Sequence, residues 1–238
     1  QYMRESEKAE NDLVRVLQSA KNRPSPIDGY FGAVYYIGPI FTAFRGTPEA
    51  SQFYSLLRQE IDERVRLGKG PITPDGEMGE EKYRLVTEGP PNWTSFRDFW
   101  KMFYDEGAVV VASTYSKVGG LYDFGFRHDA DNPLESLADY CLGCYTNLNL
   151  PSRIDMICKY IDEYQADGLL INSIKSCNSF SAGQLLILRE VEKRTGKPAA
   201  FIETDLVDPR YFSAANVKNR LESYFQMIKQ KRAAGAAH

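Results

Sequence analysis

Four short apolar segments alternate with helix signals in this 238-residue chain, and this alternation limits the folds it can adopt. The segments span 83–87, 108–112, 168–174 and 199–203. The second of these is a continuous, Val-rich apolar run, which is typical of a strand that is covered on both faces. Strand–helix alternation at this spacing predicts right-handed βαβ units. We therefore predict an α/β fold with a parallel, doubly wound sheet of the Rossmann or flavodoxin-like kind.

The chain before residue 81 shows a different, helical pattern. We predict helices over 3–21, 30–44 and 47–67. The last of these begins at Thr47-Pro48-Glu49, which provides a capping hydroxyl, a proline at the first helical position and an acid in the first turn. A segment rich in Gly, Pro and acid follows at 70–79 and marks a boundary. We therefore predict a helical region over 1–80 and an α/β domain over 81–238.

The chain begins with Gln1 rather than Met and enters a helical pattern at once. We therefore expect a further segment upstream, so that residues 1–80 form the end of a preceding domain.

Several polar residues are predicted to begin or end helices within the α/β region. Capping boxes of the Ser-x-x-Asp type predict helix starts at Ser95 and Ser152, and Ser213 is predicted to cap the final helix. Residues 133–145 and 181–194 are also predicted to be helical. The Ala-rich tail from Lys229 is predicted to be frayed.

Charge and hydropathy exclude two classes of partner. Acidic residues number 32 and basic residues 29, a net charge of −3 that argues against a general nucleic-acid surface. No apolar run approaches the roughly 18 residues that a membrane helix needs, and no secretory leader is evident. The sequence therefore predicts a cytoplasmic protein without a membrane partner.

The four cysteines are the main candidates for chemistry. Disulfides are rare in the cytoplasm, so Cys141, Cys144, Cys158 and Cys177 are expected to be core thiols, metal ligands or nucleophiles. Cys158 lies on the apolar face of its predicted helix and is expected to be a core residue. Cys141 and Cys144 form a Cys-x-x-Cys pair that lets two sulfurs face one metal. A four-cysteine zinc site would need a second pair, and a redox dithiol remains an alternative.

Cys177 follows a predicted strand and precedes a predicted helix. A thiolate at this position lies near a helix N-terminus, which favours an anion. Its neighbours Ser176, Asn178 and Ser179 can donate hydrogen bonds to sulfur and so tune an iron–sulfur centre. The alternative is a small buried thiol in a tight turn.

Three further side chains are candidates for proton transfer. His128 has a side chain that titrates near neutrality, although its acidic neighbours favour a solvated histidine in a surface turn. Glu203 and Asp205 follow a predicted strand, where a carboxylate could relay protons or cap the next turn.

Residues 113–132 form a long loop that we consider a candidate lid or substrate wall. Its aromatic residues could also serve core packing. They are Tyr115, Tyr122, Phe124 and Phe126.

An ordered set of short motifs resembles the C-terminal domain of the benzoyl-CoA reductase and 2-hydroxyacyl-CoA dehydratase subunits. The resemblance covers roughly residues 82 to 231. The stretch Cys-Leu-Gly-Cys-Tyr-Thr-Asn-Leu-Asn-Leu-Pro from Cys141 is more similar to the reductase branch. The other motifs are Arg84-Leu-Val-Thr-Glu-Gly-Pro-Pro-Asn-Trp, Arg153-Ile-Asp, Ala166-Asp-Gly-Leu-Leu-Ile, Cys177, Gly196-Lys-Pro, Glu203-Thr-Asp and Arg220-Leu-Glu.

This resemblance implies a [4Fe–4S] cluster held by three cysteines, with one iron open to substrate. By position, Cys144 and Cys177 match two ligands. The third would come from an upstream domain or from Cys141. A related branch carries two cubanes joined by a sulfide, and that arrangement remains an alternative.

The resemblance also implies the reaction and the partners. The reaction would be a low-potential one-electron reduction of a CoA thioester, with benzoyl-CoA dearomatisation as the first expectation and 2-hydroxyacyl-CoA dehydration as the alternative. The partners would be a paralogous iron–sulfur subunit and an ATP-dependent activator that donates electrons, as in anaerobic degradation of aromatic compounds.

Two rival functions remain open at this point. One is a non-catalytic electron-transfer or scaffold subunit of the same family. The other is a nucleotide-binding α/β domain, but no Gly-x-Gly-x-x-Gly or Walker-type loop follows any predicted strand.

Overall fold

The computed structural model of the chain describes residues 1–29, 38, 44–73, 75–115 and 125–235. These residues belong to two compact units, each of which is described by itself. The first unit comprises 1–81 and 116–148, and the second comprises 82–115 and 149–238. The boundary near residue 81 lies where the composition changes, and the division into two domains at that point stays a prediction. Residues 116–148 lie in the same unit as the N-terminal helices.

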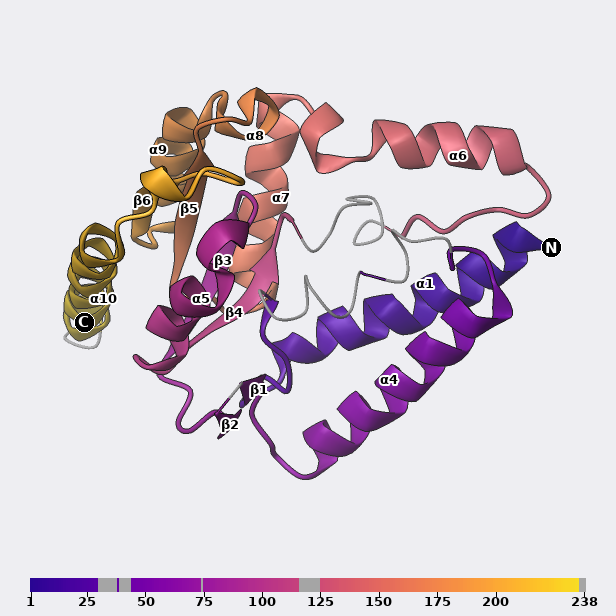
Figure 1. Cartoon of the computed structure of the whole chain (residues 1–238), viewed down its shortest axis with the longest axis horizontal. Helices are drawn as coiled ribbons and strands as arrows, with labels where there is room; N and C mark the ends of the chain where they lie inside the picture. The colour runs from indigo at the N-terminus through magenta and orange to yellow at the C-terminus, as the bar shows by residue number, and fades with distance from the viewer. Residues whose placement is uncertain (30–37, 39–43, 74, 116–124, 236–238) are drawn as a thin grey trace. The chain divides into compact units, whose positions relative to one another are not determined.

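The first unit is mainly helical. Helix α1 (Tyr2–Gln18) continues into a 3₁₀ turn at Ser19–Lys21 and packs along α4 (Pro48–Arg66) (Figure 1). The predicted cap of α4 is confirmed, because the Thr47 hydroxyl accepts a hydrogen bond from the Ala50 N–H at 3.3 Å. A short hairpin of β1 (Ile72–Thr73) and β2 (Gly76–Glu77) follows. The helix predicted over 30–44 lies almost entirely outside the described residues.

Apolar side chains on facing sides of α1 and α4 form the core of this unit, as the spacing of the apolar positions predicts. A third helix, α6 (Pro133–Leu142), contributes only Ser136 to the buried set. The buried apolar residues of α1 and α4 are Ala9, Leu13, Val14, Val16, Leu17, Ala50, Tyr54 and Ile61.

The second unit contains the predicted parallel sheet. Strands β3 (Tyr83–Glu88), β4 (Ala108–Ser113), β5 (Gly168–Ile174) and β6 (Ala199–Thr204) form one four-stranded sheet in the order β4-β3-β5-β6 (Figure 1). Every neighbouring pair is parallel. All residues of β3, β4 and β5 are buried, which explains the continuous apolar run at the start of β4. Strands β3 and β5 also contain buried polar residues, among them Glu88 and Asn172. The predicted α/β fold is confirmed.

Helices lie on both faces of this sheet. Helix α5 (Phe96–Tyr104) contacts α10 (Ala214–Gly235) on one face, and α7 (Leu150–Glu163) contacts α9 (Gln184–Thr195) on the other. The Tyr83 ring at the start of β3 stacks on Phe225 of α10 with centroids 4.7 Å apart. This contact anchors the last helix to the sheet.

The helix start predicted at Ser95 is confirmed, because Ser95 is the N-cap of α5, but its side chain makes no capping hydrogen bond. Two other predicted helix starts are wrong. Ser152 lies inside α7, because Asn149 caps that helix three residues earlier and accepts from the Ser152 N–H at 2.9 Å. The helix predicted from Ser181 begins at Gln184, after the left-handed Gly183. Ser213 is confirmed as a cap, with its hydroxyl 3.5 Å from the Asn216 N–H.

The prediction of a frayed tail is also wrong as far as Gly235. Helix α10 continues to that residue, in part because alanine has the strongest intrinsic helix propensity. The Arg232 side chain fixes this end as well, since it pairs with Asp167 and donates to the Lys82 carbonyl at 2.8 Å.

The strand order reverses at β3. The chain leaves β3 for β4 on one side, and later returns to β5 on the other side. In parallel α/β sheets, ligands bind outside the carboxyl ends of the strands at such a switch point. In this unit the switch point lies beyond Glu88 of β3 and Ile174 of β5.

Candidate functional site

The cysteine pair of the first unit lies at the end of α6. Cys141 is exposed in the last turn of the helix, and Cys144 is half-buried just beyond it. The Asn147 amide donates to the Cys141 carbonyl at 2.6 Å, and the Asn147 N–H donates to the Cys144 carbonyl at 2.8 Å. The Cys144 sulfur lies 3.5 Å from the Thr146 hydroxyl. The backbone is therefore fixed, and neither cysteine forms a disulfide.

Cys177 lies in the second unit, directly after β5. It is half-buried and forms the N-cap of α8 (Asn178–Ser181), so the predicted position between strand and helix is confirmed. Its N–H donates to the Ile174 carbonyl at 3.1 Å, and its carbonyl accepts from the Ser181 hydroxyl at 2.9 Å. The loop around Cys177 therefore has a defined backbone and a free sulfur.

Asp205 holds this loop from the neighbouring strand. One carboxylate oxygen accepts from the Ser176 N–H at 3.0 Å, and the other accepts from the N–H groups of Val207 and Asp208, each at 3.0 Å. Hydrogen bonds from the backbone, first that of Val207, lower the pKa of the Asp205 carboxyl to about 2. Of the two roles considered for Asp205, capping of the following turn is confirmed.

The residues next to Cys177 form hydrogen bonds to other parts of the second unit. The Ser179 carbonyl accepts from Arg153 at 2.9 Å, and the Ser176 N–H is engaged by Asp205. Asn178 begins α8. A role for Ser176, Asn178 and Ser179 toward a cluster stays a prediction.

The thiols suit iron, although the described residues do not assemble a complete metal site. No group of three or more His, Cys, Asp or Glu side chains able to hold a metal ion occurs in the described part of the chain. Cysteine side chains, as thiolates, are the ligands that iron–sulfur clusters use. Cys141 and Cys144 belong to the first unit and Cys177 to the second.

Cys158 differs from these three. It is half-buried on α7 rather than a fully buried core residue, and burial raises the pKa of its thiol while Arg194 opposes that rise. A thiol with a raised pKa is a poor thiolate ligand at neutral pH.

A buried polar network occupies the switch point of the sheet. The Asn172 amide donates to the Pro90 carbonyl at 2.7 Å, and its oxygen accepts from the Thr204 hydroxyl at 2.9 Å. The Gln184 amide donates to the Glu88 carboxylate. Glu88, Asn172 and Thr204 are fully buried. These hydrogen bonds tie the carboxyl ends of β3, β5 and β6 to the start of α9.

The prediction that His128 is a solvated surface residue is wrong. The His128 residue is only 2% exposed to solvent. Its Nδ1 contacts the buried Glu10 carboxylate of α1, which also accepts from the His128 N–H at 3.0 Å. Glu10 lies 118 residues away, so the local acidic sequence gave no sign of this partner.

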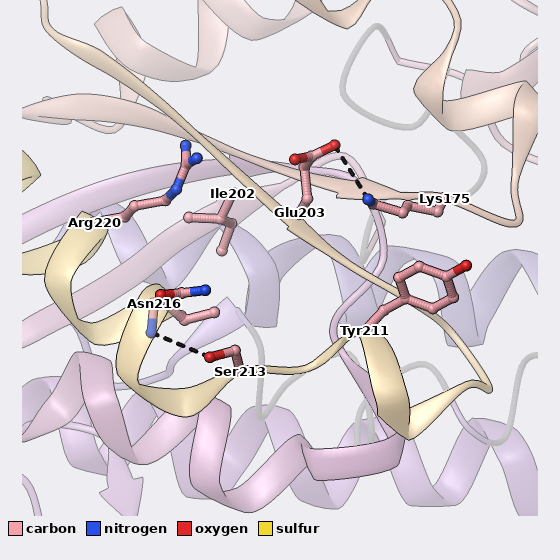
Figure 2. Close-up of a pocket in the computed structure, with 8 residues that line it drawn as sticks. Lys175, Ile202, Glu203, Tyr211, Ser213, Asn216 and Arg220 are labelled. Carbon is pink, nitrogen blue, oxygen red and sulfur yellow. Dashed lines mark hydrogen bonds and ion pairs between the residues drawn. The ribbon is translucent and has the colours of Figure 1, made fainter.

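Glu203 lines a small cavity beside β6 and α10 (Figure 2). The cavity has a volume of about 180 Å³, and the Lys175 ammonium lies 3.8 Å from the Glu203 carboxylate within it. Both side chains are about half exposed. The remaining lining residues are Ile202, Tyr211, Ser213, Asn216, Val217 and Arg220.

The aromatic residues of the predicted long loop are only partly described. Tyr115 lies edge-on to Trp93 at 6.2 Å, and Phe126 lies edge-on to His128 at 5.3 Å. Packing is therefore the observed role of both. Tyr122 and Phe124 lie outside the described residues.

Comparison with known proteins gives the family. The family described as 2-hydroxyglutaryl-CoA dehydratase, D-component, matches residues 1–228. The chain belongs to this family. The predicted resemblance is thus confirmed over nearly the whole chain.

Named relatives place the chain near the reductase members. One of the benzoyl-CoA reductase subunits of Thauera aromatica is 78% identical over 98% of this chain and 54% of its own length. The alpha subunits of (R)-phenyllactyl-CoA dehydratase from Clostridium sporogenes and (R)-2-hydroxyisocaproyl-CoA dehydratase from Clostridioides difficile are 26% and 28% identical over 98% and 90% of this chain. They are covered over 54% and 49% of their own lengths. The chain therefore spans about half the length of these relatives.

Two buried polar residues of this member of the 2-hydroxyglutaryl-CoA dehydratase D-component family were not predicted from its sequence. Glu10 and Gln184 were missed, because neither lies in a motif and each finds its partner far along the chain. Glu88 could be flagged, since it directly follows a predicted strand. As for the membrane, no helix among the described residues has the length and apolar character to cross one.

Proposed function

We propose that the full-length protein is an iron–sulfur subunit of an enzyme that reduces benzoyl-CoA by low-potential, one-electron steps. The observation that carries this proposal is the 78% identity to the Thauera aromatica benzoyl-CoA reductase polypeptide over nearly the whole chain. The dehydratase subunits, at 26% and 28% identity, are much less similar. The reductase reaction is therefore favoured over 2-hydroxyacyl-CoA dehydration.

The proposed cofactor is a [4Fe–4S] cluster with Cys144 and Cys177 as ligands and Cys141 as a candidate third. Free, accessible thiols at the end of α6 and at the switch point of the sheet support this assignment. Bound there, the cluster would supply electrons at low potential, and the surrounding hydrogen bonds and burial would set that potential. Two cubanes joined by a sulfide form the alternative cofactor.

The relatives are named as subunits, which supports a partner subunit for this protein. The proposed partners are a paralogous iron–sulfur subunit, an ATP-dependent activator that donates electrons, and the CoA thioester itself. A cytoplasmic location is proposed as well. A non-catalytic electron-transfer or scaffold role in the same complex is the second candidate.

Proton supply is proposed for Glu203 or His128. Glu203 is exposed enough to exchange protons with solvent. His128 is buried between Glu10 and Arg45, so it would donate only after taking up a second proton.

The test is the reaction itself. The full-length protein, purified anaerobically with its partner subunits and activator, should consume benzoyl-CoA in the presence of ATP and a low-potential reductant. Product analysis should show a cyclic diene. Dehydration of a 2-hydroxyacyl-CoA by the same preparation, without reduction of benzoyl-CoA, would contradict the proposal and favour the dehydratase alternative.

A further inference from the structure

Arg45 is held in place by two rings of the first unit. Its Nη2 lies 3.4 Å from Nε2 of His128. Its guanidinium carbon lies 4.4 Å from the centroid of the Tyr140 ring on α6. The two rings are themselves 5.1 Å apart. The guanidinium group is therefore held by contacts to both rings.

The contacts define the protonation of His128. An arginine only donates hydrogen bonds, so Nε2 of His128 is the acceptor. The ring proton must then lie on Nδ1, where it faces the Glu10 carboxylate. Glu10 thus fixes the His128 tautomer, and His128 in turn fixes Arg45.

Among the residues that the structure describes, Arg45 forms no ion pair with a carboxylate. The Glu10 carboxylate contacts Nδ1 of His128, the other ring nitrogen from the one that faces Arg45. The side chain is nevertheless half-buried. Taking a charge partly out of water without a counter-ion is costly, so a positioned but unpaired guanidinium points to an anion that comes from outside the chain.

We propose that Arg45 binds a phosphate oxyanion of the CoA thioester, with Glu10, His128 and Tyr140 as its positioning residues. This inference rests on the proposed function. Arginine presents a planar fork of N–H donors that matches phosphate oxygens. In benzoyl-CoA the acyl group and the thioester are neutral, so the phosphates are the only anions that the ligand offers.

The test measures binding of free CoA to the full-length protein in its complex, by calorimetry under anaerobic conditions. Arg45→Gln should weaken CoA binding at least about 10-fold, equivalent to about 1.4 kcal/mol. Arg45→Lys keeps the charge but loses the fork, and should give an intermediate loss. Arg66→Gln is the matched control, because Arg66 lies in the same unit, is largely exposed and pairs with Glu63. It should bind CoA like the wild type.

Pantetheine, which lacks phosphates, distinguishes a phosphate contact from a general defect. It should bind the wild type and Arg45→Gln equally. Equal CoA affinity of the wild type and Arg45→Gln would overturn the inference, as would a penalty of the same size for pantetheine.

The same measurements separate this inference from the proposed function. If the wild type reduces benzoyl-CoA and Arg45→Gln binds CoA as tightly as the wild type, only the proposed role of Arg45 is contradicted. If the wild-type complex binds neither CoA nor benzoyl-CoA, both the role of Arg45 and the proposed function are contradicted. Unfolding curves of each variant show whether a loss of binding comes from a loss of folding.

Discussion

Gly89 lies against the carbonyl group of Asn172, so closely that a Cβ at position 89 would collide with that oxygen. Gly89 also has a left-handed φ of +95°. Its backbone joins the end of β3 to the loop that contains Pro90, whose carbonyl accepts the Asn172 amide. The switch point of the sheet thus depends on a position without a side chain.

The first prediction follows from this contact. Gly89→Ala should destabilise the second unit by about 3 kcal/mol or more, because the strain of a positive φ adds to a backbone collision. Gly196→Ala is the matched control, since Gly196 has a φ of +68° but nothing within 4 Å of an added Cβ. It should cost only about 1 to 2 kcal/mol. Urea unfolding measures both variants, and an equal loss of unfolding free energy in the two would contradict a collision at position 89.

Asp205 should make stability depend on pH. Its pKa falls from 3.8 to about 2 on folding, so the unfolded state binds a proton more readily. The stabilisation is therefore complete above about pH 4 and is lost as the pH falls toward 2. Asp205→Asn should be about 1 to 3 kcal/mol less stable at pH 7, with a difference that shrinks at pH 3.

Urea unfolding at pH 7, 5 and 3 measures this difference. Asp155→Asn is the control, because Asp155 is exposed and forms an ion pair with Arg194 at 2.7 Å. Exposed ion pairs contribute little, so its effect should stay within about 0.5 kcal/mol at pH 7. A constant difference between the wild type and Asp205→Asn from pH 7 to 3 would show that the carboxylate charge has no part in holding the Ser176 loop.

The Glu10 and His128 side chains should be strongly coupled. His128→Leu removes the ring from a buried carboxylate and should cost about 3 kcal/mol or more. Removal of both groups, in Glu10→Leu with His128→Leu, should cost less than the sum of the single changes. A double-mutant cycle of unfolding free energies measures this coupling. Strictly additive losses would mean that the two side chains do not stabilise each other.

Local sequence signals predicted the sheet but not its polar contacts. Each strand carries a short apolar segment, and Thr47-Pro48 begins a helix as expected, because these signals act within a few residues. The start of α7 was mispredicted at Ser152, since Asn149 is an equally good cap and lies before Pro151. Two caps that compete within four residues cannot be ranked from local sequence.

The candidate site was predictable only in part. The cysteines and Glu203 could be proposed from their residue types and their places after helices or strands. The Glu10–His128–Arg45 arrangement could not, because tertiary packing of distant segments creates it. Burial reversed the expectation for His128, whose neighbours in sequence, Asp129 and Asp131, are hydrophilic.

Iron and sulfide analysis of anaerobically purified full-length complexes tests the central claim most directly. Cys144→Ala and Cys177→Ala should each lose most of the cluster iron and sulfide, while Cys158→Ala, a change at a half-buried thiol on α7, should retain both. Wild-type iron content in both Cys144→Ala and Cys177→Ala would contradict the assignment of these two thiols as cluster ligands.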